Sequence, residues 1–270
     1  IRGGDTYQTN LTQQLRCELP SAMTPETVFW RLRRDHPAPF SAYLRRRSST
    51  VVSASPERFF RTTRSNDIES SPIKGTRPRG RTRDADLRLR SELLSSAKDR
   101  AENTMIVDLV RNDLGRVCKY GSVAVEKLCD IEEHPTLFHL VSTVRGDLRD
   151  GVKLSEILRA VFPCGSITGA PKIRTMQIID RTEDSARGLS MGAIGLYLPE
   201  SWDFGNALVD TVLDLSVAIR TMVIRDGEAV FNVGGGVVID SVPEKEFEES
   251  LLKAQSLLNA IGASYPESDD

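Results

Sequence analysis

The feature that most constrains the fold is a series of short segments rich in β-branched and aromatic residues, the last two of which are separated by Asp226-Gly227. Aspartate followed by glycine between two such segments is a strong signal for a tight β-hairpin. The sequence predicts strands at residues 7–15, 40–53, 191–198, 213–224 and 229–233. The final two strands are therefore expected to pair antiparallel.

Helical periodicity occupies much of the remaining sequence, and residues 84–110 predict a single long helix. The apolar stripe expected on this helix consists of Leu87, Leu94, Ala101, Met105 and Leu109. Further helices are expected at residues 154–161, 171–181 and 242–261, and the residues from Ser241 to Glu244 form a capping-box pattern at the start of the last helix. We expect an α+β fold of packed, mostly antiparallel β-sheets flanked by outer helices.

The composition is that of an ordinary globular protein, with 39% hydrophobic and 27% charged residues. The length fits one domain, expected over residues 1–265, followed by a polar tail at residues 266–270. A strand-like segment starts almost at the first residue, so we expect that an N-terminal region is absent. No apolar run is long enough for a membrane span or a secretory signal, which predicts a cytoplasmic protein. The four cysteines are widely spaced, so we expect reduced thiols.

Arginines crowd the first hundred residues, although the formal net charge is only −2. They include Arg45 to Arg47, Arg77 and Arg79. Such a patch attracts anions, and a solvated basic surface is the simpler interpretation. Aromatic residues are not interleaved with these arginines as they are in nucleic-acid readers, and the recognised folds of such proteins are missing, so we expect no nucleic-acid partner.

Two pairs of acidic residues are spaced three apart within predicted helices, Asp99 with Glu102 and Glu246 with Glu249. This spacing places both carboxylates of a pair on one helix face. Oxygen ligands of this kind suit Mg²⁺, which binds one or two carboxylates together with waters and an anionic substrate. Acidic pairs on solvated helix faces are equally common, so each pair alone leaves both interpretations open.

Two segments rich in small residues are candidates for anion binding. Gly234-Gly235-Gly236 follows a strand, where main-chain N–H groups can approach an anion, although a bend or bulge explains the glycines equally well. The second segment, residues 163–172, runs into a predicted helix whose first amides and Lys172 would face an anion. Neither segment matches a dinucleotide or Walker motif.

Lys74 stands between Ile73 and Gly75 in a loop where the neighbouring Pro72 and Gly75 fix the backbone direction. A lysine must be neutral to attack carbon. Nearby cations such as Arg77 and Arg79, or partial burial, would favour the neutral amine. The alternative is an ordinary exposed lysine in an arginine-rich loop.

Taken together, these segments resemble the chorismate-utilising enzymes, the family of anthranilate, aminodeoxychorismate, isochorismate and salicylate synthases. The resemblance covers nearly the whole chain, and so many motifs in family order make coincidence implausible. The motifs are Tyr7 to Leu11, Ser55 to Phe59, Pro72 to Thr76, Glu102-Asn103, Arg111 to Val117, His134-Pro135, His139 to Ser142, Gly169 to Lys172 and Asp240 to Glu244. The resemblance implies the α+β fold of anthranilate synthase.

The resemblance also implies a ligand set for Mg²⁺ and for a dianionic substrate, chorismate. Glu102 and Glu249 would hold the metal, supported by Asp99 and Glu246. The groups expected to contact the substrate are Ser166, Lys172, Arg220, Gly234, Gly235, Gly236 and Lys253.

The nucleophile used by this family is indicated at two positions. Isochorismate and salicylate synthases carry a water-activating lysine where Gln8 stands, and glutamine has no titratable proton to act as a base. Anthranilate synthases have alanine in place of Lys74, so a lysine there resembles the aminodeoxychorismate synthases. The implied mechanism uses Lys74 as a covalent nucleophile and Glu57 as a proton donor. His139, expected in a partly apolar helix, would assist on the C4 side, and Ser122 would orient the substrate.

The expected activity is that of a transferase of the transaminase class, which uses glutamine-derived ammonia to make 4-amino-4-deoxychorismate for para-aminobenzoate and folate synthesis. The ammonia would come from a glutamine amidotransferase subunit or domain, because no amidotransferase cysteine–histidine arrangement is visible in the chain. Two alternatives stay open, an anthranilate-type synthase with an unusual lysine and a truncated module that binds chorismate without turnover.

Overall fold

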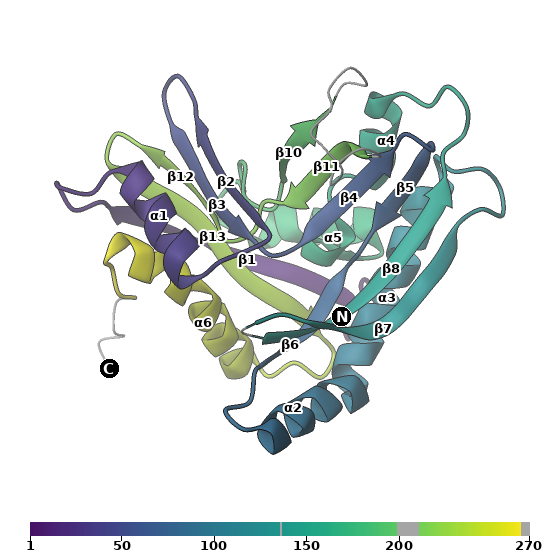
Figure 1. Ribbon diagram of the computed structural model, residues 1–270, viewed down its shortest axis with the longest axis horizontal. Coiled ribbons are helices and arrows are strands. Elements are labelled where there is room, and N and C mark those ends of the chain that lie inside the picture. The colour runs from purple at the N-terminus through teal and green to yellow at the C-terminus, as the bar shows by residue number, and fades with distance from the viewer. Residues whose placement is uncertain (136, 199–210, 266–270) are drawn as a thin grey trace. The chain divides into compact units, whose positions relative to one another are not determined.

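The computed structural model describes residues 1–135, 137–198 and 211–265. The chain divides into two compact units, each with a sheet (Figure 1). Unit 1 comprises Ile1–Glu57, Ile167–Ile194 and Ser216–Asp270, and unit 2 comprises Arg58–Ser166 and Gly195–Leu215. The prediction of one catalytic domain over residues 1–265 stays a prediction, and the tail at 266–270 lies outside the described residues.

Unit 1 contains a sheet with the strand order β2-β3-β12-β13-β1-β9. The longest pair is antiparallel, with β1 running from Gln8↔Val238 to Glu18↔Glu228 against β13. The strands are β1 (Gln8–Glu18), β2 (Phe40–Arg45), β3 (Thr50–Ser55), β9 (Gly169–Ala170), β12 (Thr221–Arg225) and β13 (Glu228–Val238). Asp226 and Gly227 both have positive φ, 51° and 82°, which confirms the predicted tight turn between β12 and β13.

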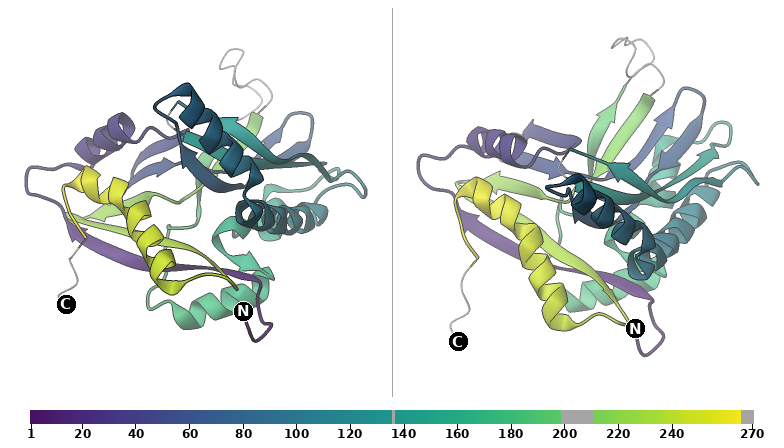
Figure 2. Two further views of the ribbon diagram at one scale, coloured as in Figure 1. Left: turned by 90° about the horizontal axis from the view of Figure 1, so that it is seen from below. Right: turned by 60° about the horizontal axis from the view of Figure 1, so that its bottom comes forward.

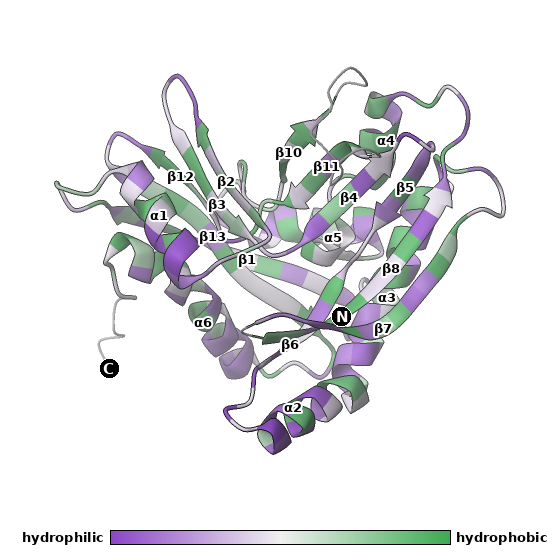
Figure 3. Cartoon of the chain, in the orientation of Figure 1, coloured by the Kyte–Doolittle hydropathy of each residue, from purple (hydrophilic) through white to green (hydrophobic). Residues whose placement is uncertain are grey.

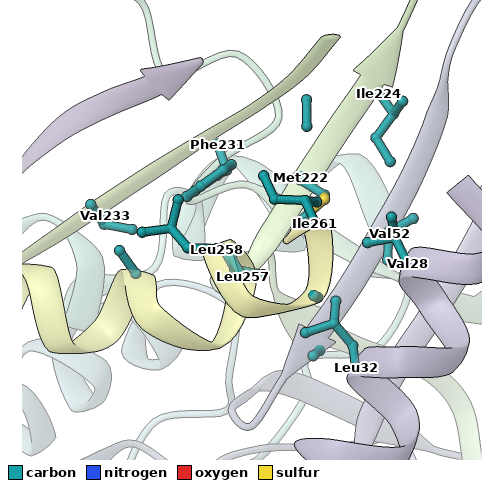
Figure 4. Close-up of a cluster of buried hydrophobic side chains, with 14 residues drawn as sticks. Val28, Leu32, Val52, Met222, Ile224, Phe231, Val233, Leu257, Leu258 and Ile261 are labelled. Carbon is teal, nitrogen blue, oxygen red and sulfur yellow. The ribbon is translucent and has the colours of Figure 1, made fainter. Parts of the chain in front are cut away.

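One face of this sheet is covered by α1 (Pro25–Asp35) and α6 (Pro243–Ile261), which pack against each other and against the strands. A cluster of buried apolar side chains lies between them, and Phe231, Leu257 and Met222 in it are fully buried (Figure 4). Thr24 caps α1 by accepting a hydrogen bond from the Thr27 amide. α5 (Lys172–Thr182) packs on β1 and β9.

Unit 2 contains a sheet with the order β10-β11-β4-β5-β8-β6, with β7 also paired to β8. Its strands are β4 (Arg58–Thr63), β5 (Asp67–Ser70), β6 (Ile73–Pro78), β7 (Ala124–Glu133), β8 (Leu137–Asp147), β10 (Ala193–Tyr197) and β11 (Thr211–Val217). Ion pairs cross these strands: Arg58 contacts Asp214 at 3.0 Å, and Arg145 contacts Asp67 at 2.7 Å. β4 to β8 were not predicted from the sequence, because charged residues that pair across strands obscure the alternation of apolar and polar positions.

The helices of unit 2 are α2 (Arg83–Ser95), α3 (Ala97–Gly115) and α4 (Leu154–Val161), followed by a 3₁₀ turn η1 (Gly165–Ile167). α2 and α3 pack on the sheet at β6, β7 and β8, and α4 packs on α3. Figure 2 shows α2, α3 and α6 from two further directions. Among the described residues no helix is long and apolar enough to cross a membrane.

Two predicted strands are each two strands in the structure. Residues 40–53 form β2 and β3, which are joined by a turn in which the Arg46 amide donates to the Ser49 carbonyl at 2.8 Å. Residues 213–224 form the end of β11 and most of β12, which belong to different sheets. The break falls at Arg220, whose φ is 46°, a left-handed conformation that a continuous strand excludes.

The predicted helix at residues 84–110 is broken. Ser96 has extended backbone angles and its side chain accepts a hydrogen bond from the Asp99 amide, so it ends α2 and caps α3. The break changes the phase of the helix, and the predicted stripe is therefore wrong: Leu87 is 55% exposed, whereas Leu93 and Ile106 are fully buried. The overall class, mixed helices with largely antiparallel sheets, is confirmed.

Candidate functional site

Lys74 lies in a β-bulge of β6. Ile73 pairs with Val141 and Thr76 with His139, so β6 has one residue more than β8 across the same interval. A bulge of this kind changes the direction in which a side chain points. Lys74 itself is partly buried, so it is not an ordinary fully exposed lysine.

Gly75 makes this bulge possible. Its φ is +82°, a region that favours glycine, and a Cβ atom there would lie 2.8 Å from Leu93 Cδ1 and 2.9 Å from Asp99 Cγ. Leu93 is fully buried, so both the Leu93 and Asp99 side chains would have to shift to accept a Cβ atom at Gly75. The backbone beside Lys74 therefore contacts α2 and α3 directly.

The arginines that follow Lys74 are neutralised by acids, contrary to the expected cationic environment. Arg77 contacts Glu92 at 2.8 Å and Asp99 at 3.4 Å. Arg79 binds Asp86 through two hydrogen bonds of 2.8 and 2.5 Å, and these bonds lower the pKa of the Asp86 carboxyl to about 2. Arg77 and Arg79 therefore do not supply the unpaired positive charge that was expected to favour a neutral Lys74.

Asp99 and Glu102 lie one helical turn apart on α3, as the spacing predicts, and both carboxylates are largely buried. The side chains are 18% and 15% exposed, respectively. Asp99 pairs with Arg77, and Glu102 lies 3.9 Å from the Lys98 ammonium. Each acid therefore already has a cationic neighbour.

A buried polar network, which the sequence did not predict, fixes α3 against the strands. Asn103 is fully buried, and its amide nitrogen donates to the carbonyls of Leu140 at 3.4 Å and Pro72 at 3.5 Å. The Ser142 hydroxyl donates to the amide oxygen of Asn103 and accepts from the Cys129 amide at 2.8 Å. Asn103 thus connects the helix that carries Glu102 to the residue that precedes β6.

His139 lies in β8, so the expectation of a helix there is wrong. It is 6% exposed, and its Nδ1 lies 2.9 Å from the Thr76 hydroxyl, two residues beyond Lys74. Ser122, in contrast, bonds to Lys119 and to Asp147 at the opposite end of β8. Eight residues of strand correspond to roughly 26 Å. The structure therefore brings His139, but not Ser122, close to the bulge.

Unit 1 brings several other predicted residues together on one face of α6. The Lys253 ammonium donates to the Gly234 carbonyl at 3.2 Å and pairs with Glu249 at 2.7 Å. Glu246 accepts a 2.6 Å hydrogen bond from Ser241, which holds the carboxylate beside the glycines. A Cβ atom at Gly235 would lie 3.4 Å from the Glu246 carboxylate, so the glycine allows this close approach. The expected capping box is wrong, because Ser241 binds Glu246 and the Val238 amide instead of the first helical turn.

Arg220 and Glu57 lie at the ends of two neighbouring strands of the unit 1 sheet, because Arg220 directly precedes β12 and Glu57 follows β3. Burial lowers the pKa of the Arg220 guanidinium, and among the described residues no acid forms an ion pair with it. Arg220 is partly buried, and a partly buried cation without an acid partner is a natural receptor for an anionic ligand. Glu57 is 6% exposed, and its carbonyl accepts from the Val217 amide at 3.0 Å.

The remaining predicted residues lie near β1 and α5 or at the end of unit 2. Gln8 is fully buried, and neither polar atom of its side chain has a partner among the described residues. Lys172 is the first residue of α5, whose N-cap, Pro171, makes no side-chain bond to the helix amides. Ser166 is 6% exposed in η1, with its hydroxyl 3.3 Å from the Cys164 sulfur.

An ion pair that the sequence did not predict anchors the segment after α5 to β1. Arg187 binds Glu183 at 2.6 Å and donates to the Asn10 and Ile167 carbonyls at 2.7 Å each. Glu183 in turn accepts from the Thr12 amide at 2.7 Å. This clamp occupies the hydrogen-bonding edge of β1 beyond the short strand β9.

The acids predicted to bind Mg²⁺ divide between the units, Asp99 and Glu102 in unit 2 and Glu246 and Glu249 in unit 1. Their oxygen-only chemistry fits this hard cation. In the part of the chain that the structure describes, no three acidic, histidine or cysteine side chains form a ready-made cluster. The metal assignment therefore stays a prediction.

Comparison with known proteins agrees with the resemblance in the motifs. Residues 1–259 match the family model for chorismate binding enzymes. The chain is 47% identical over 265 residues to an aminodeoxychorismate synthase from Streptomyces pristinaespiralis, covering 98% of this chain and 35% of the relative. It is 48% identical over 262 residues to an anthranilate synthase component 1 from Haloarcula marismortui, covering 97% of this chain and 51% of the relative.

The fold is likewise shared with a solved structure, anthranilate synthase component I from Streptococcus pneumoniae. The TM-score is 0.81 at 33% identity, over 95% of this chain and 54% of that one. The chain thus spans about a third to a half of the length of these relatives. From the motifs, the family match and the fold together, the chain belongs to the family of chorismate binding enzymes.

Proposed function

We propose that the chain is the catalytic region of an aminodeoxychorismate synthase, which replaces the C4 hydroxyl of chorismate with ammonia. The observation that carries the proposal is the position of Lys74. This lysine is partly buried and lies in the bulge of β6 beside Gly75, where packing against Leu93 and Asp99 leaves room only for a glycine. The resemblance associates alanine at this position with anthranilate synthases. The relatives include both enzymes at similar identity, so the lysine is the feature that favours amination at C4.

In the proposed reaction the Lys74 amine attacks C2 of chorismate, the ring double bonds shift, and the C4 hydroxyl leaves as water with a proton from Glu57. Ammonia then adds at C4, the double bonds shift back, and the bond between C2 and the lysine nitrogen breaks. A covalent intermediate divides one difficult substitution into two easier steps. His139, whose Nδ1 lies 2.9 Å from the hydroxyl of Thr76, is proposed to stabilise charge or move a proton on the C4 side.

The anionic groups of the substrate require cations and N–H donors. Arg220, the Gly234 to Gly236 amides, Lys253, Lys172 and Ser166 are proposed to serve them. Glu102, Glu249, Asp99 and Glu246 are proposed to hold Mg²⁺, which would neutralise a substrate carboxylate. A glutamine amidotransferase subunit or domain is the proposed source of ammonia.

Product analysis tests the proposal. The purified chain is incubated with chorismate, Mg²⁺ and ammonium, and the products are separated by chromatography with mass detection. We expect 4-amino-4-deoxychorismate. Fluorescent anthranilate as the main product would establish an anthranilate-type synthase, and chorismate binding without any product would leave a binding module.

The role of Lys74 is tested by Lys74→Ala, with Lys127→Ala as the matched control because Lys127 is an exposed lysine of the same unit. Loss of a covalent nucleophile is expected to lower kcat by about 10³-fold or more. Intact-protein mass analysis should detect a chorismate-derived adduct on the unsubstituted chain and none on Lys74→Ala. Retention of the adduct in that variant would exclude Lys74 as the nucleophile.

The metal assignment is tested by Glu102→Gln against Asp108→Asn, a substitution on the same helix at a carboxylate that is 69% exposed. Calorimetry with Mg²⁺ in the presence of chorismate measures binding directly. Loss of one of two proposed ligands should weaken Mg²⁺ binding by about 10-fold or more. Equal affinity in both variants would remove Glu102 from the metal site.

A further inference from the structure

The arginines Arg45 to Arg47, which the proposed chemistry does not use, lie at one end of the unit 1 sheet beside a second hairpin. β2 ends at Arg45, which pairs with Thr50, and Thr50 pairs in turn with Ile224 on β12. The turn between β2 and β3 therefore lies beside the turn between β12 and β13. This register also places Arg225, the last residue of β12, in the same region. The loop that joins β2 and β3 is strongly hydrophilic (Figure 3).

A hollow of about 390 Å³ lies between these two turns and the start of α1. This volume is within the range of small-molecule sites. The polar and charged groups that line it include Arg45, Arg46, Arg47, Arg225, Ser49 and Thr24. Thr24 is the N-cap of α1, so the positive end of that helix also borders the hollow.

The charges in this hollow are not balanced. Four arginines line it, against a single carboxylate from Asp226. Among the described residues none of the four forms an ion pair, in contrast to Arg58, Arg79 and others in unit 2 that are paired with acids. Like charges placed this close repel one another, and a bound anion would relieve the repulsion.

Ser49 provides an independent observation. It lines the hollow and is 8% exposed, and its hydroxyl has no hydrogen-bond partner in the described part of the chain. Buried hydroxyl groups in folded proteins nearly always have a partner, which can be a bound ligand or water. The unpaired hydroxyl and the unpaired guanidinium groups thus occur in the same place.

We propose that this hollow binds a small anion with two or more phosphoryl groups, such as pyrophosphate or a nucleoside diphosphate or triphosphate. Guanidinium groups form paired hydrogen bonds with phosphate oxygens, and several phosphoryl groups are needed to match the number of cations. The site involves neither Lys74 nor the acids proposed for Mg²⁺, so it is independent of the proposed reaction.

The test is calorimetric titration of the 270-residue chain with sodium pyrophosphate at low ionic strength. We expect saturable binding of one pyrophosphate per chain. Arg46→Ala combined with Arg47→Ala should weaken binding by about 10- to 100-fold, because each substitution removes a charge-assisted contact. Both arginines are exposed at a turn, so the fold should be retained, and circular dichroism checks this.

The matched control is Arg81→Ala combined with Arg88→Ala, which removes the same charge from exposed positions of unit 2. Equal weakening in the control, or no saturable binding at all, would overturn the proposal. A parallel titration with ATP identifies the source of the phosphoryl groups: equal affinity supports an inorganic anion, and tighter binding supports a nucleotide. If a DNA or RNA oligonucleotide binds more tightly than either ligand and depends on the same arginines, the surface is a nucleic-acid site and the proposal fails.

Discussion

Two arginine-rich segments of similar composition have opposite electrostatic outcomes in this protein. Beside the Lys74 bulge, Arg77 and Arg79 are paired with Glu92, Asp99 and Asp86. At the β2–β3 turn, Arg45 to Arg47 form no ion pair among the described residues. The first segment packs against helices that supply carboxylates, whereas the second ends at a hairpin whose neighbouring turn adds Arg225.

The comparison shows that a basic run in a sequence does not establish a basic site. Near Lys74 the arginines serve as structural links, since Arg77 connects β6 to both α2 and α3. At the β2–β3 turn, Arg45 to Arg47 have no acidic partner among the described residues and can bind an anion in the hollow. Function therefore depends on where the counter-charges lie, and long-range packing determines their position.

The largest expected effect compares two glycines that have the same φ of +82°, Gly75 at the bulge and Gly227 at the turn. Gly75→Ala would place a methyl group 2.8 Å from the buried Leu93, whereas Gly227→Ala finds nothing within 4 Å. We expect Gly75→Ala to lower the free energy of unfolding by about 3 kcal/mol or more and Gly227→Ala by about 1–2 kcal/mol. Urea denaturation measures both, and equal losses would show that backbone strain alone explains the bulge.

A smaller effect is expected from removing one arginine in each region. Arg77→Gln breaks a partly buried pair, in which the Arg77 and Asp99 side chains are 27% and 18% exposed, and should cost about 1 kcal/mol. Arg47→Gln removes an unpaired surface charge and should change stability by less than about 0.5 kcal/mol. Denaturation at low and high salt separates the two, because salt should reduce only the Arg77 effect. A larger loss for Arg47→Gln would mean that the turn is held by contacts of its own.

The smallest effect concerns pH. The pKa of Asp86 is lowered from 3.8 to about 2, chiefly by Arg79, so its contribution to stability is complete above about pH 4 and is lost as the pH falls towards 2. We expect thermal stability to fall with pH through this window more steeply in the unsubstituted chain than in Asp86→Asn. Identical acid profiles would show that the Arg79 pair does not contribute measurably to folding.

Parts of the fold were predictable because local chemistry decides them. The Asp226-Gly227 turn, proline in the first turn of α6 and the α4 and α5 helices follow from backbone preferences and short-range periodicity. Strands β4 to β8 were not predicted, because they carry charged residues that are stable in a sheet only when a neighbouring strand supplies the opposite charge. Arg58 and Asp214 are such a pair. The break at Ser96 was also missed, since apolar residues continue past it on both sides.

The candidate site divides in the same way. Motif resemblance supplied Lys74, Glu102, His139, Arg220 and the glycines, since each of these residue types has a recognisable chemical role. The role it gave to Ser122 stays a prediction, although Ser122 bonds at the far end of β8 from His139, and it did not predict Asn103 or Arg187. Buried polar residues of this kind give no local signal, because their partners are distant in sequence. By the same resemblance we expect a local insertion at residues 204–209, and this segment lies outside the described residues.

The sequence by itself determined the family, the α+β class and the residue types available for chemistry, because these depend on motifs and on backbone preferences that act over a few residues. Only the tertiary structure decided which charges are paired, how the bulge at Lys74 is built and which face of α3 is buried. The physical reason is that these outcomes depend on hydrogen bonds and packing between residues far apart in the chain. A hydrophobic or charge pattern cannot specify such partners until the strands and helices have come together.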